Sequence, residues 1–443
     1  MTTANPRHAA FNILLRIEKE RSYADILIDR ELSVGLLKGP DRGLLTELVY
    51  GVLRRQGTLD HIISRCSKQR LDKLERAVLL LLRLGLYQAF FLDRVPVSAA
   101  VNETVKLAHA LVPRAAGFIN AVLRRADRER NAIPYPDRDA DPAGFIAATY
   151  STPSWIAEDW IGQLGVEEAE ALAQAMLAHP PFTVRVNTLK TGREELRSRL
   201  AAEGMAAETA RYSPFALHLS GPVQLGALSS FREGLFTVQD ESSQMAAILL
   251  APQPGERVLD LCAAPGGKTT HLAQLMDNRG AIFACDAAPR KLELVEETAA
   301  RLGIGIIATT PLNATRRLPP MTKPLNDAHS IGDQGGGETA TQAYRKVLHG
   351  ARDEANADIH RFDRILVDAP CSGLGVLRRN PEGKWWKSRQ NVAELVAIQK
   401  AILRNAANCL AESGALLYAT CSTTREENEA VIMIFFLCVP ILC

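Results

Sequence analysis

The chain has 443 residues, of which 47% are apolar and 23% charged, and its mean hydropathy is −0.04. This length predicts two to four domains, and the ordinary charge content excludes a disordered, collagen-like or coiled-coil chain. The first twenty residues carry charges where a signal peptide needs an apolar segment, and the final apolar run, AVIMIFFLCVPILC, is shorter than a membrane-spanning helix. Eight cysteines in so long a chain do not indicate a disulfide scaffold. We therefore expect a soluble cytoplasmic protein with free thiols.

The net charge of +2 hides an asymmetry along the chain. Residues 1–130 contain 22 Lys and Arg against 14 Asp and Glu, a net charge of +8, whereas the remainder carries 30 against 36, a net charge of −6. A basic N-terminal module favours a polyanionic partner, most simply nucleic acid. The charge alone is equally consistent with a helical domain whose arginines are only solvated.

Residues 5–130 show helical periodicity nearly throughout, because apolar side chains recur at spacings of three and four, as in LLTELVYGVLRR. Proline and glycine interrupt the pattern at three places, which are Gly39–Asp41, Arg94–Pro96 and Val112–Pro113. The pattern predicts an all-α domain of about seven helices over residues 1–131. Residues 132–150 hold three prolines among several aspartates, which is typical of a linker.

The middle of the chain changes character. Helical periodicity over 153–177 is followed by a strand pattern (FTVRVNTLK), an amphipathic helix (GREELRSRLAAEG) and a second strand (ALHLSG). We interpret residues 151–235 as a helical segment that leads into a small α+β subdomain.

From residue 236 onward, short apolar strands alternate with helices. The strands are RVLDLC, AIFACD, GIIATT, DRILVDAP and GALLYATC. This alternation predicts a parallel, doubly wound sheet over residues 236–443, with its ligand at the carboxyl ends of the strands. Residues 319–361 hold a glycine triplet and little apolar periodicity, so we interpret them as an inserted, mobile surface loop with one short helix near Ala343–Ala351.

The first chemical motif is VLDLCAAPGGKTTHL, residues 258–272, in which a strand runs into a glycine-rich turn and a helix. Gly266 and Gly267 lack a Cβ, so the backbone can approach a ligand closely at the helix N-terminus. The turn is neither a dinucleotide G-x-G-x-x-G nor a P-loop. Asp286 ends the next strand, where a carboxylate can accept hydrogen bonds from both hydroxyls of a ribose. Together these features predict an adenosine-type cofactor; the alternative is a tight turn with a chance aspartate.

Two further motifs, DRILVDAPCSGLG and LLYATCSTTREEN, each place a cysteine just after a strand. The first holds Asp368, Pro370 and Cys371, and the second holds Cys421. Taken singly, each cysteine is better explained as a core residue. The nucleotide turn at the same sheet edge favours a catalytic pair. Nothing in the sequence identifies a group that would lower the pKa of Cys421, which a thiolate nucleophile needs.

The segment VLRRNPEGKWWKSRQ, residues 376–390, carries five basic residues against one acidic residue, around two tryptophans. Basic side chains hold phosphates while an aromatic ring stacks on an unpaired base. The candidate RNA contacts are Arg378, Arg379, Lys384 and Trp385. The alternative is that one tryptophan belongs to the core and the charges are merely solvated.

In the order CAAPGGK, DAPCSG and ATCS, these motifs resemble those of the RNA cytosine-5 methyltransferases that use S-adenosylmethionine. From residue 5 to about 432 the chain is similar to the bacterial RsmB (Sun, or Fmu) family of 16S ribosomal RNA enzymes. The resemblance implies a NusB-like, all-α RNA-binding domain, a small RNA-recognition-like subdomain and a Rossmann-like methyltransferase domain. It also implies a monomer that acts on 16S rRNA, or on an early small-subunit assembly intermediate, without a metal.

The resemblance implies roles for single residues. Cys421 is the nucleophile that adds to C6 of the cytosine, Cys371 assists proton removal and product release, and Asp368 holds the base beside the methyl donor. The implied cofactor contacts are Cys262, Ala263, Ala264, Pro265, Gly266, Gly267, Lys268, Asp286, Asn313 and Asp368. Because C6 is inaccessible in a helix stack, the base must be unpaired or flipped out.

The chain departs from the family pattern at three places. Asn313 stands where the family usually has an acidic residue, which predicts weaker cofactor binding. The segment 319–361 is longer than the usual link, and the family's final helix and strand pair are missing after EEN, which we interpret as a truncation. Two alternatives therefore stay open, a catalytically impaired RNA-binding or ribosome-assembly factor and a cytosine-5 methyltransferase acting on another RNA such as tRNA.

Overall fold

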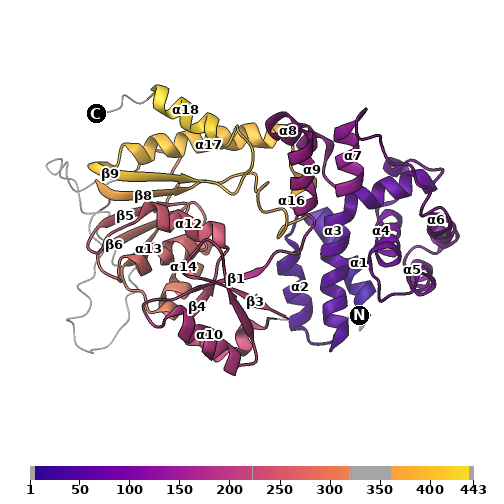
Figure 1. The fold of residues 1–443 in the computed structure, drawn as a ribbon, viewed down its shortest axis with the longest axis horizontal. Helices are drawn as coiled ribbons and strands as arrows, with labels where there is room; N and C mark the ends of the chain where they lie inside the picture. Colours follow the sequence, from indigo (N-terminus) through magenta and orange to yellow (C-terminus); the bar gives the residue numbers. More distant parts are fainter. Residues whose placement is uncertain (1–4, 222, 319–320, 322–360, 439–443) are drawn as a thin grey trace. The chain divides into compact units, whose positions relative to one another are not determined.

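The computed structural model of the chain describes residues 5–221, 223–318, 321 and 361–438, and only the backbone of the last four. The chain forms two compact units, each assembled from separate stretches of sequence (Figure 1). The helical unit contains residues up to Pro180 together with Gly373–Asn391, and the α/β unit contains Pro181–Ser372 and the chain from Val392 onward. No helix in the described ranges is long and apolar enough to cross a membrane.

The N-terminal part of the helical unit is an α-helical domain around one apolar core. Within residues 5–130, all of which are described, its α-helices are α1 (Pro6–Glu20), α2 (Ala24–Ser33), α3 (Pro40–Cys66), α4 (Arg76–Phe91), α5 (Val97–Leu111) and α6 (Ala116–Arg128). The all-α prediction is confirmed, with six α-helices in place of about seven. The short 3-10 helices η1 (Leu71–Lys73) and η2 (Pro113–Ala115) lie between them. The three predicted interruptions all fall at helix boundaries. Pro40 and Pro113 are the first residues of α3 and η2, and Arg94–Pro96 lies between α4 and α5, because proline fits only the first turn of a helix.

A second core in the same unit is built by α7 (Pro142–Tyr150), α8 (Ser154–Leu164) and α9 (Val166–Ala175). Helix α7 lies inside 132–150, so the linker interpretation is wrong for the second half of that range. The reason is local, because Asp141 caps the helix by accepting a hydrogen bond from the Gly144 N–H at 2.9 Å, and Pro142 occupies the first turn. Ile146 of α7 is fully buried.

The smaller sheet of the α/β unit is antiparallel, in the order β2-β3-β1-β4. Its strands are β1 (Phe182–Val186), β2 (Ala206–Thr209), β3 (Ala216–Ser220) and β4 (Phe236–Val238), and helix α10 (Arg193–Ala202) packs on it. Short helices η3 (Leu225–Ala227) and α11 (Ser229–Arg232) precede β4. Because β4 pairs with β1, the predicted boundary at residue 235 is wrong and the subdomain continues to Val238.

The larger sheet is parallel throughout, in the order β7-β6-β5-β8-β9, which confirms the doubly wound prediction. Its strands are β5 (Arg257–Leu261), β6 (Ala281–Asp286), β7 (Ile307–Pro311), β8 (Phe362–Asp368) and β9 (Leu410–Ala419). The helices are α12 (Glu241–Leu250), α13 (Gly267–Leu275), α14 (Pro289–Leu302), α17 (Arg389–Ala407) and α18 (Glu429–Cys438).

Helices cover both faces of this sheet (Figure 1). Val258 and Ile282 pack with α12, α13 and α14, whereas the neighbouring Leu259 and Phe283 pack on the opposite face with α17. This follows from the alternation of side chains along a strand. The predictions for 319–361 fall on residues outside the described ones, except for Met321 and Arg361.

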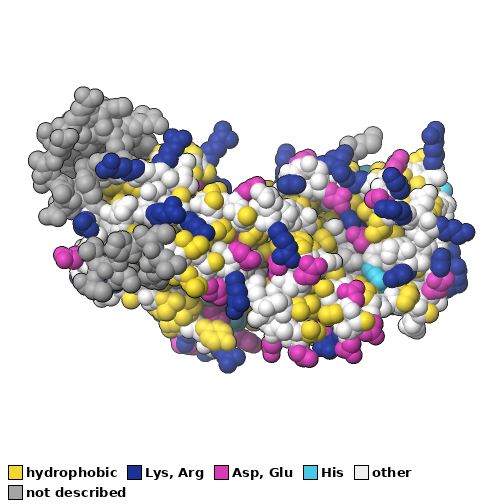
Figure 2. Space-filling model, turned by 90° about the horizontal axis from the view of Figure 1, so that it is seen from above, with side chains coloured by type: hydrophobic (Ala, Val, Ile, Leu, Met, Phe, Trp, Pro, Cys, Tyr) yellow, Lys and Arg dark blue, Asp and Glu magenta, His cyan; other side chains and the backbone are white. Residues whose placement is uncertain are grey.

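The face of the helical unit that Figure 2 shows carries charges of both signs, although the sequence predicts a basic N-terminal module. There, Lys and Arg side chains of the helical unit lie among Asp and Glu side chains and form no continuous basic surface on that face. One of the arginines is internal, because Arg83 is 5% exposed and forms ion pairs with Glu18 and Asp60.

Candidate active site

Strand register brings the predicted motifs together at one edge of the parallel sheet. Leu261 of β5 pairs with Cys285 of β6 on one side and with Val367 of β8 on the other. Asp368, at the end of β8, pairs with Ala419 at the end of β9. The residues that follow each strand, including the glycine-rich turn and both cysteines, therefore lie side by side.

The two glycines of the turn have different surroundings. Gly266 has a φ of +100°, and a Cβ there would lie 3.0 Å from the Cα of Val295 in α14. Only glycine accommodates both this conformation and this contact. A Cβ at Gly267 would lie 3.8 Å from its nearest neighbour, the Gln239 side chain, which is an ordinary van der Waals contact, so a side chain at this position would not clash.

Asp286 is held against the turn by backbone donors. One carboxylate oxygen accepts a hydrogen bond from the Ala264 N–H at 3.3 Å and the other from the Ala288 N–H at 2.8 Å. An ionised carboxylate offers about four lone-pair sites, so further hydrogen bonds from a ligand can be accepted. The side chain is half-buried. This environment fits the hydroxyls of a ribose.

A backbone hydrogen bond brings Asn313 close to Asp286: the N–H of Leu312, the residue before Asn313, donates to the Asp286 carbonyl at 2.9 Å. The Asn313 side-chain oxygen accepts from the Thr315 N–H at 3.0 Å and from the Thr315 hydroxyl at 2.6 Å. The residue is exposed at the same strand edge as the turn.

The two cysteines form a close pair. Their sulfurs are 3.0 Å apart, and the Cys421 N–H donates to the Cys371 sulfur at 3.2 Å. Beside them the Lys268 ammonium contacts the Asp368 carboxylate at 2.6 Å. The hydrogen bond from Cys371 lowers the pKa of Cys421; the Lys268 charge acts in the same direction, while burial and Asp368 oppose it. The group that sequence reasoning could not find is thus Cys371, with help from Lys268.

The other cysteines with perturbed pKa values are shifted in the opposite direction. Burial and three nearby carboxylates raise the pKa of Cys262 to about 12. Burial also raises the pKa of Cys285 and of Cys409. Cys421, which is exposed, is therefore better suited to act as a thiolate than these three.

Three buried groups support the site and escaped sequence reasoning. Arg185 of β1 is 1% exposed and donates to the Gly267 carbonyl at 2.6 Å and to the Thr270 hydroxyl at 3.0 Å, and burial lowers its pKa to about 9. Asp260 and Glu427 are fully buried carboxylates. A charged residue inside an apolar strand, as in FTVRV and RVLDLC, was the available signal for the first two.

The predicted RNA contacts sit in the helical unit and are partly internal. Lys384 is 5% exposed and its ammonium donates to the Arg54 carbonyl at 3.0 Å, so its assignment as a phosphate contact is wrong for this structure. The Trp385 indole N–H donates to the Leu53 carbonyl at 3.1 Å, and its ring is half-buried. Lys384 and Trp385 belong to the short helix α16 (Gly383–Trp386), whose two tryptophan rings gain free energy by burying their large apolar surface.

Two of the predicted RNA contacts, Arg378 and Arg379, are half-buried arginines of the same segment. Arg378 donates to the His179 carbonyl at 2.9 Å within the helical unit. Arg379 is half-buried as well. Their role in RNA binding stays a prediction.

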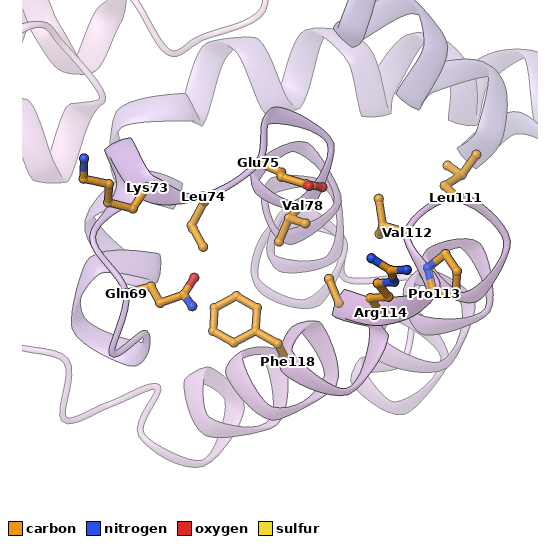
Figure 3. A pocket seen from close by; sticks show the side chains of 11 residues that line it. Gln69, Lys73, Leu74, Glu75, Val78, Leu111, Val112, Pro113, Arg114 and Phe118 are labelled. Atoms are coloured by element: carbon orange, nitrogen blue, oxygen red, sulfur yellow. The ribbon is translucent and has the colours of Figure 1, made fainter.

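A pocket of about 500 Å³ opens elsewhere in the helical unit (Figure 3). Leu74, Val78 and Phe118 supply its apolar lining, and Gln69 and Arg114 its polar lining. It contains none of the predicted site residues. Among the described residues, no cluster of His, Cys, Asp or Glu is arranged to hold a metal ion.

Comparison with protein families matches three successive parts of the chain. Residues 4–128 match the NusB family, residues 152–226 match the ferredoxin-like domain of RsmF/B-like methyltransferases, and residues 247–319 and 340–437 match the 16S rRNA methyltransferase RsmB/F family. The unmatched stretch 320–339 lies inside the segment that we predict to be an insertion.

Two curated relatives and one solved structure are similar to this chain over nearly its whole length. The probable ribosomal RNA small subunit methyltransferase B of Bacillus subtilis is 36% identical over 98% of this chain and 89% of its own length. The corresponding Synechocystis protein is 36% identical over 96% of this chain and 87% of its own length. The crystal structure of PH0851 superposes with a TM-score of 0.74 at 26% identity, covering 99% of this chain and 90% of that one. The chain therefore belongs to the family of ribosomal RNA small subunit methyltransferase B.

Proposed function

We propose that the protein methylates carbon 5 of a cytosine in 16S ribosomal RNA, with S-adenosylmethionine as the methyl donor and Cys421 as a covalent nucleophile. The observation that carries this proposal is the pair of sulfurs 3.0 Å apart at the ends of β8 and β9, beside the Lys268–Asp368 ion pair. Family membership supports the substrate class.

The residues at the sheet edge fit the proposed donor. Asp286 would accept hydrogen bonds from the ribose hydroxyls, and the glycine-rich turn at the start of α13 would lie against the ligand. When bound, S-adenosylmethionine supplies an electrophilic methyl group on a sulfonium sulfur. Asn313 would meet the adenosine beyond Asp286, where an amide can both donate and accept.

The protein's own groups would carry the remaining chemistry. The Cys421 thiolate adds to C6 of the cytosine, and the electron pair released from the C5–C6 double bond makes C5 nucleophilic. Asp368 would hold the amino and N3 side of the base. After C5 is methylated, Cys371 would give up its own proton to solvent, and its thiolate would take the C5 proton. The electrons of that C–H bond then reform the double bond as the Cys421 sulfur leaves C6 as a thiolate.

The roles of the two cysteines are separable by substitution. With methyl-labelled S-adenosylmethionine and unmodified 16S rRNA, Cys421→Ser should abolish 5-methylcytidine in a nucleoside digest, because serine is a far weaker nucleophile. Cys371→Ser should accumulate a covalent protein–RNA adduct. Cys409→Ser, in the same unit and with a raised pKa, is the matched control and should retain turnover.

The reverse pattern, an adduct in Cys421→Ser, would exchange the two assignments. Methylation of tRNA but not of 16S rRNA would move the substrate to another RNA. Binding of the donor without methylation of either RNA would favour the non-catalytic assembly factor.

A further inference from the structure

Glu427 occupies an unusual position six residues after Cys421. It lies in the loop between β9 and α18, where its neighbour Glu426 is exposed, yet its own side chain is 0% exposed. A carboxylate is buried at a high cost unless its oxygens receive several hydrogen bonds.

The Glu427 carboxylate joins three separate segments of the α/β unit. One oxygen accepts from the Ser372 N–H at 2.8 Å and from the Gln399 amide of α17 at 3.0 Å. The other accepts from the Ser372 hydroxyl at 2.5 Å and from the Thr424 hydroxyl at 3.2 Å. Hydrogen bonds to a carboxylate are stronger than those between neutral groups. Four of them hold Ser372, Gln399 and Thr424 to the Glu427 side chain.

Two of those segments carry the paired cysteines. Ser372 directly follows Cys371, and Thr424 lies three residues after Cys421. The Ser372 hydroxyl is also 3.1 Å from the Ser422 hydroxyl, which is a second link between the same loops. Gln399 ties the first loop to α17 again through the Pro370 carbonyl at 3.0 Å. The loop after β8 and the loop after β9 are therefore fixed relative to each other through one carboxylate.

We propose that Glu427 is a positioning residue that clamps these two loops and thereby holds the sulfur of Cys371 against that of Cys421. It touches neither sulfur and acts through Ser372 and Thr424. Its value for catalysis rests on the proposed function, but its effect on thiol geometry does not.

The geometry predicts a change in thiol chemistry when the clamp is removed. Cys421 is faced by Cys371, by the Lys268 ammonium and by the Asp368 carboxylate. In Glu427→Ala, the Cys371 sulfur is no longer held at 3.0 Å, so the Cys421 thiolate loses its main stabilising partner. The pH midpoint of Cys421 reactivity should rise, and a rise of one pH unit would lower its thiolate fraction near neutrality by about tenfold.

The experiment follows alkylation of the full-length protein by iodoacetamide between pH 5 and pH 10, with the Cys421 peptide quantified by mass spectrometry. Neither RNA nor a methyl donor is present, so failure of the proposed function cannot cause a failure here. Glu427→Ala should shift the profile to higher pH. Glu427→Gln should stay close to the parent, because its amide oxygen still accepts from the N–H of Ser372 and its NH₂ can donate to the two hydroxyls.

Two further variants keep the test decisive. Glu426→Ala removes an exposed carboxylate from the same loop and should leave the profile unchanged. Ser372→Ala weakens the clamp from its other side and should shift the midpoint upward by less than Glu427→Ala, and it carries the test if Glu427→Ala does not fold. A folded Glu427→Ala with the parental profile, or an unshifted Ser372→Ala in its place, would overturn the proposal.

Discussion

Asp260 is one of two fully buried acids beside the candidate active site. It is fully buried in β5, and one of its oxygens accepts a hydrogen bond from the Thr269 hydroxyl at 2.7 Å. Burial raises its pKa from 3.8 to about 7. Because the native state holds this proton more tightly than the unfolded state, the contribution of Asp260 to stability falls as pH rises from about 4 through 7.

Replacement of Asp260 by asparagine should therefore stabilise the protein in a pH-dependent way. An amide retains an acceptor for Thr269 but carries no charge to desolvate. At pH 8 the variant should be more stable by up to ~4 kcal/mol, and near pH 4 the difference should vanish. Calorimetric unfolding at the two pH values measures this, with Asp277→Asn, whose side chain is 67% exposed, as the control. An equal shift at both pH values would contradict the assignment.

Asn313 tests the adenosine end of the site. An aspartate there can accept the same two hydrogen bonds from Thr315, so Asn313→Asp changes charge without changing shape. A charged acceptor forms a stronger hydrogen bond by about 1 kcal/mol, so the variant should bind S-adenosylmethionine roughly fivefold more tightly. Titration calorimetry measures the affinity. No change would mean that residue 313 does not contact the donor.

At the level of single elements, the glycine-rich turn depends on the helix packed beneath it. Gly266 combines a left-handed backbone with a close approach to the Cα of Val295 in α14. A methyl group there must push α14 away or open the turn. The turn and α14 therefore form one structural element of the site.

The substitution Gly266→Ala should cost about 1–3 kcal/mol of stability and weaken binding of S-adenosylmethionine. Gly305→Ala is the matched control in the same unit, because a Cβ at Gly305 would meet no atom within 4 Å. Thermal unfolding and titration calorimetry compare the two. Unchanged affinity in Gly266→Ala would remove this turn from the binding site.

Elements with strong periodicity were predictable, and short or context-dependent ones were not. The strand Ala281–Asp286 matches its prediction residue for residue, because a short apolar run flanked by turns leaves few alternatives. The strand Phe236–Val238 has only three residues and no readable period. The helix Pro142–Tyr150 is absent from the prediction because prolines and aspartates over 132–150 are typical of a linker, whereas Pro142 is the first residue of the helix.

The site divides in the same way. The order of the motifs predicted which residues gather at the sheet edge, but not the 3.0 Å distance between Cys371 and Cys421, which depends on β8 and β9 being neighbours. The burial of Lys384 could not be foreseen, because a charged pattern in sequence looks alike whether it faces solvent or a core. The contacts of Glu427 join segments up to 55 residues apart.

At the scale of the whole molecule, the helical unit is discontinuous in sequence. Gly373–Asn391 supplies Leu374 and Leu377 to one of its cores and Trp386 to the other. All four tryptophans, at positions 155, 160, 385 and 386, belong to this unit, so tryptophan fluorescence reports on the helical unit alone.

A fragment of residues 1–180 should consequently be less stable than the same helices in the full chain. Loss of the inserted segment should lower the midpoint of thermal unfolding by roughly 5–10 °C, if two or three kcal/mol are lost. Tryptophan fluorescence measures both proteins, since the fragment keeps Trp155 and Trp160. A synthetic peptide of residues 373–391 should restore part of the loss, and equal midpoints without the peptide would contradict the prediction.

Because each unit is made of two separate stretches of sequence, the order of translation determines when each unit can be completed. Some 210 residues separate Pro180 from Asn391, which corresponds to roughly 10–40 s at ordinary translation rates. During that interval the helices of residues 1–180 lack the segment Gly373–Asn391, and β9 of the α/β unit is translated later still. The helical unit can therefore be completed only after most of the α/β unit has been synthesised, and the α/β unit is completed last. A ribosome that stalls before Asn391 releases a product in which both units are incomplete.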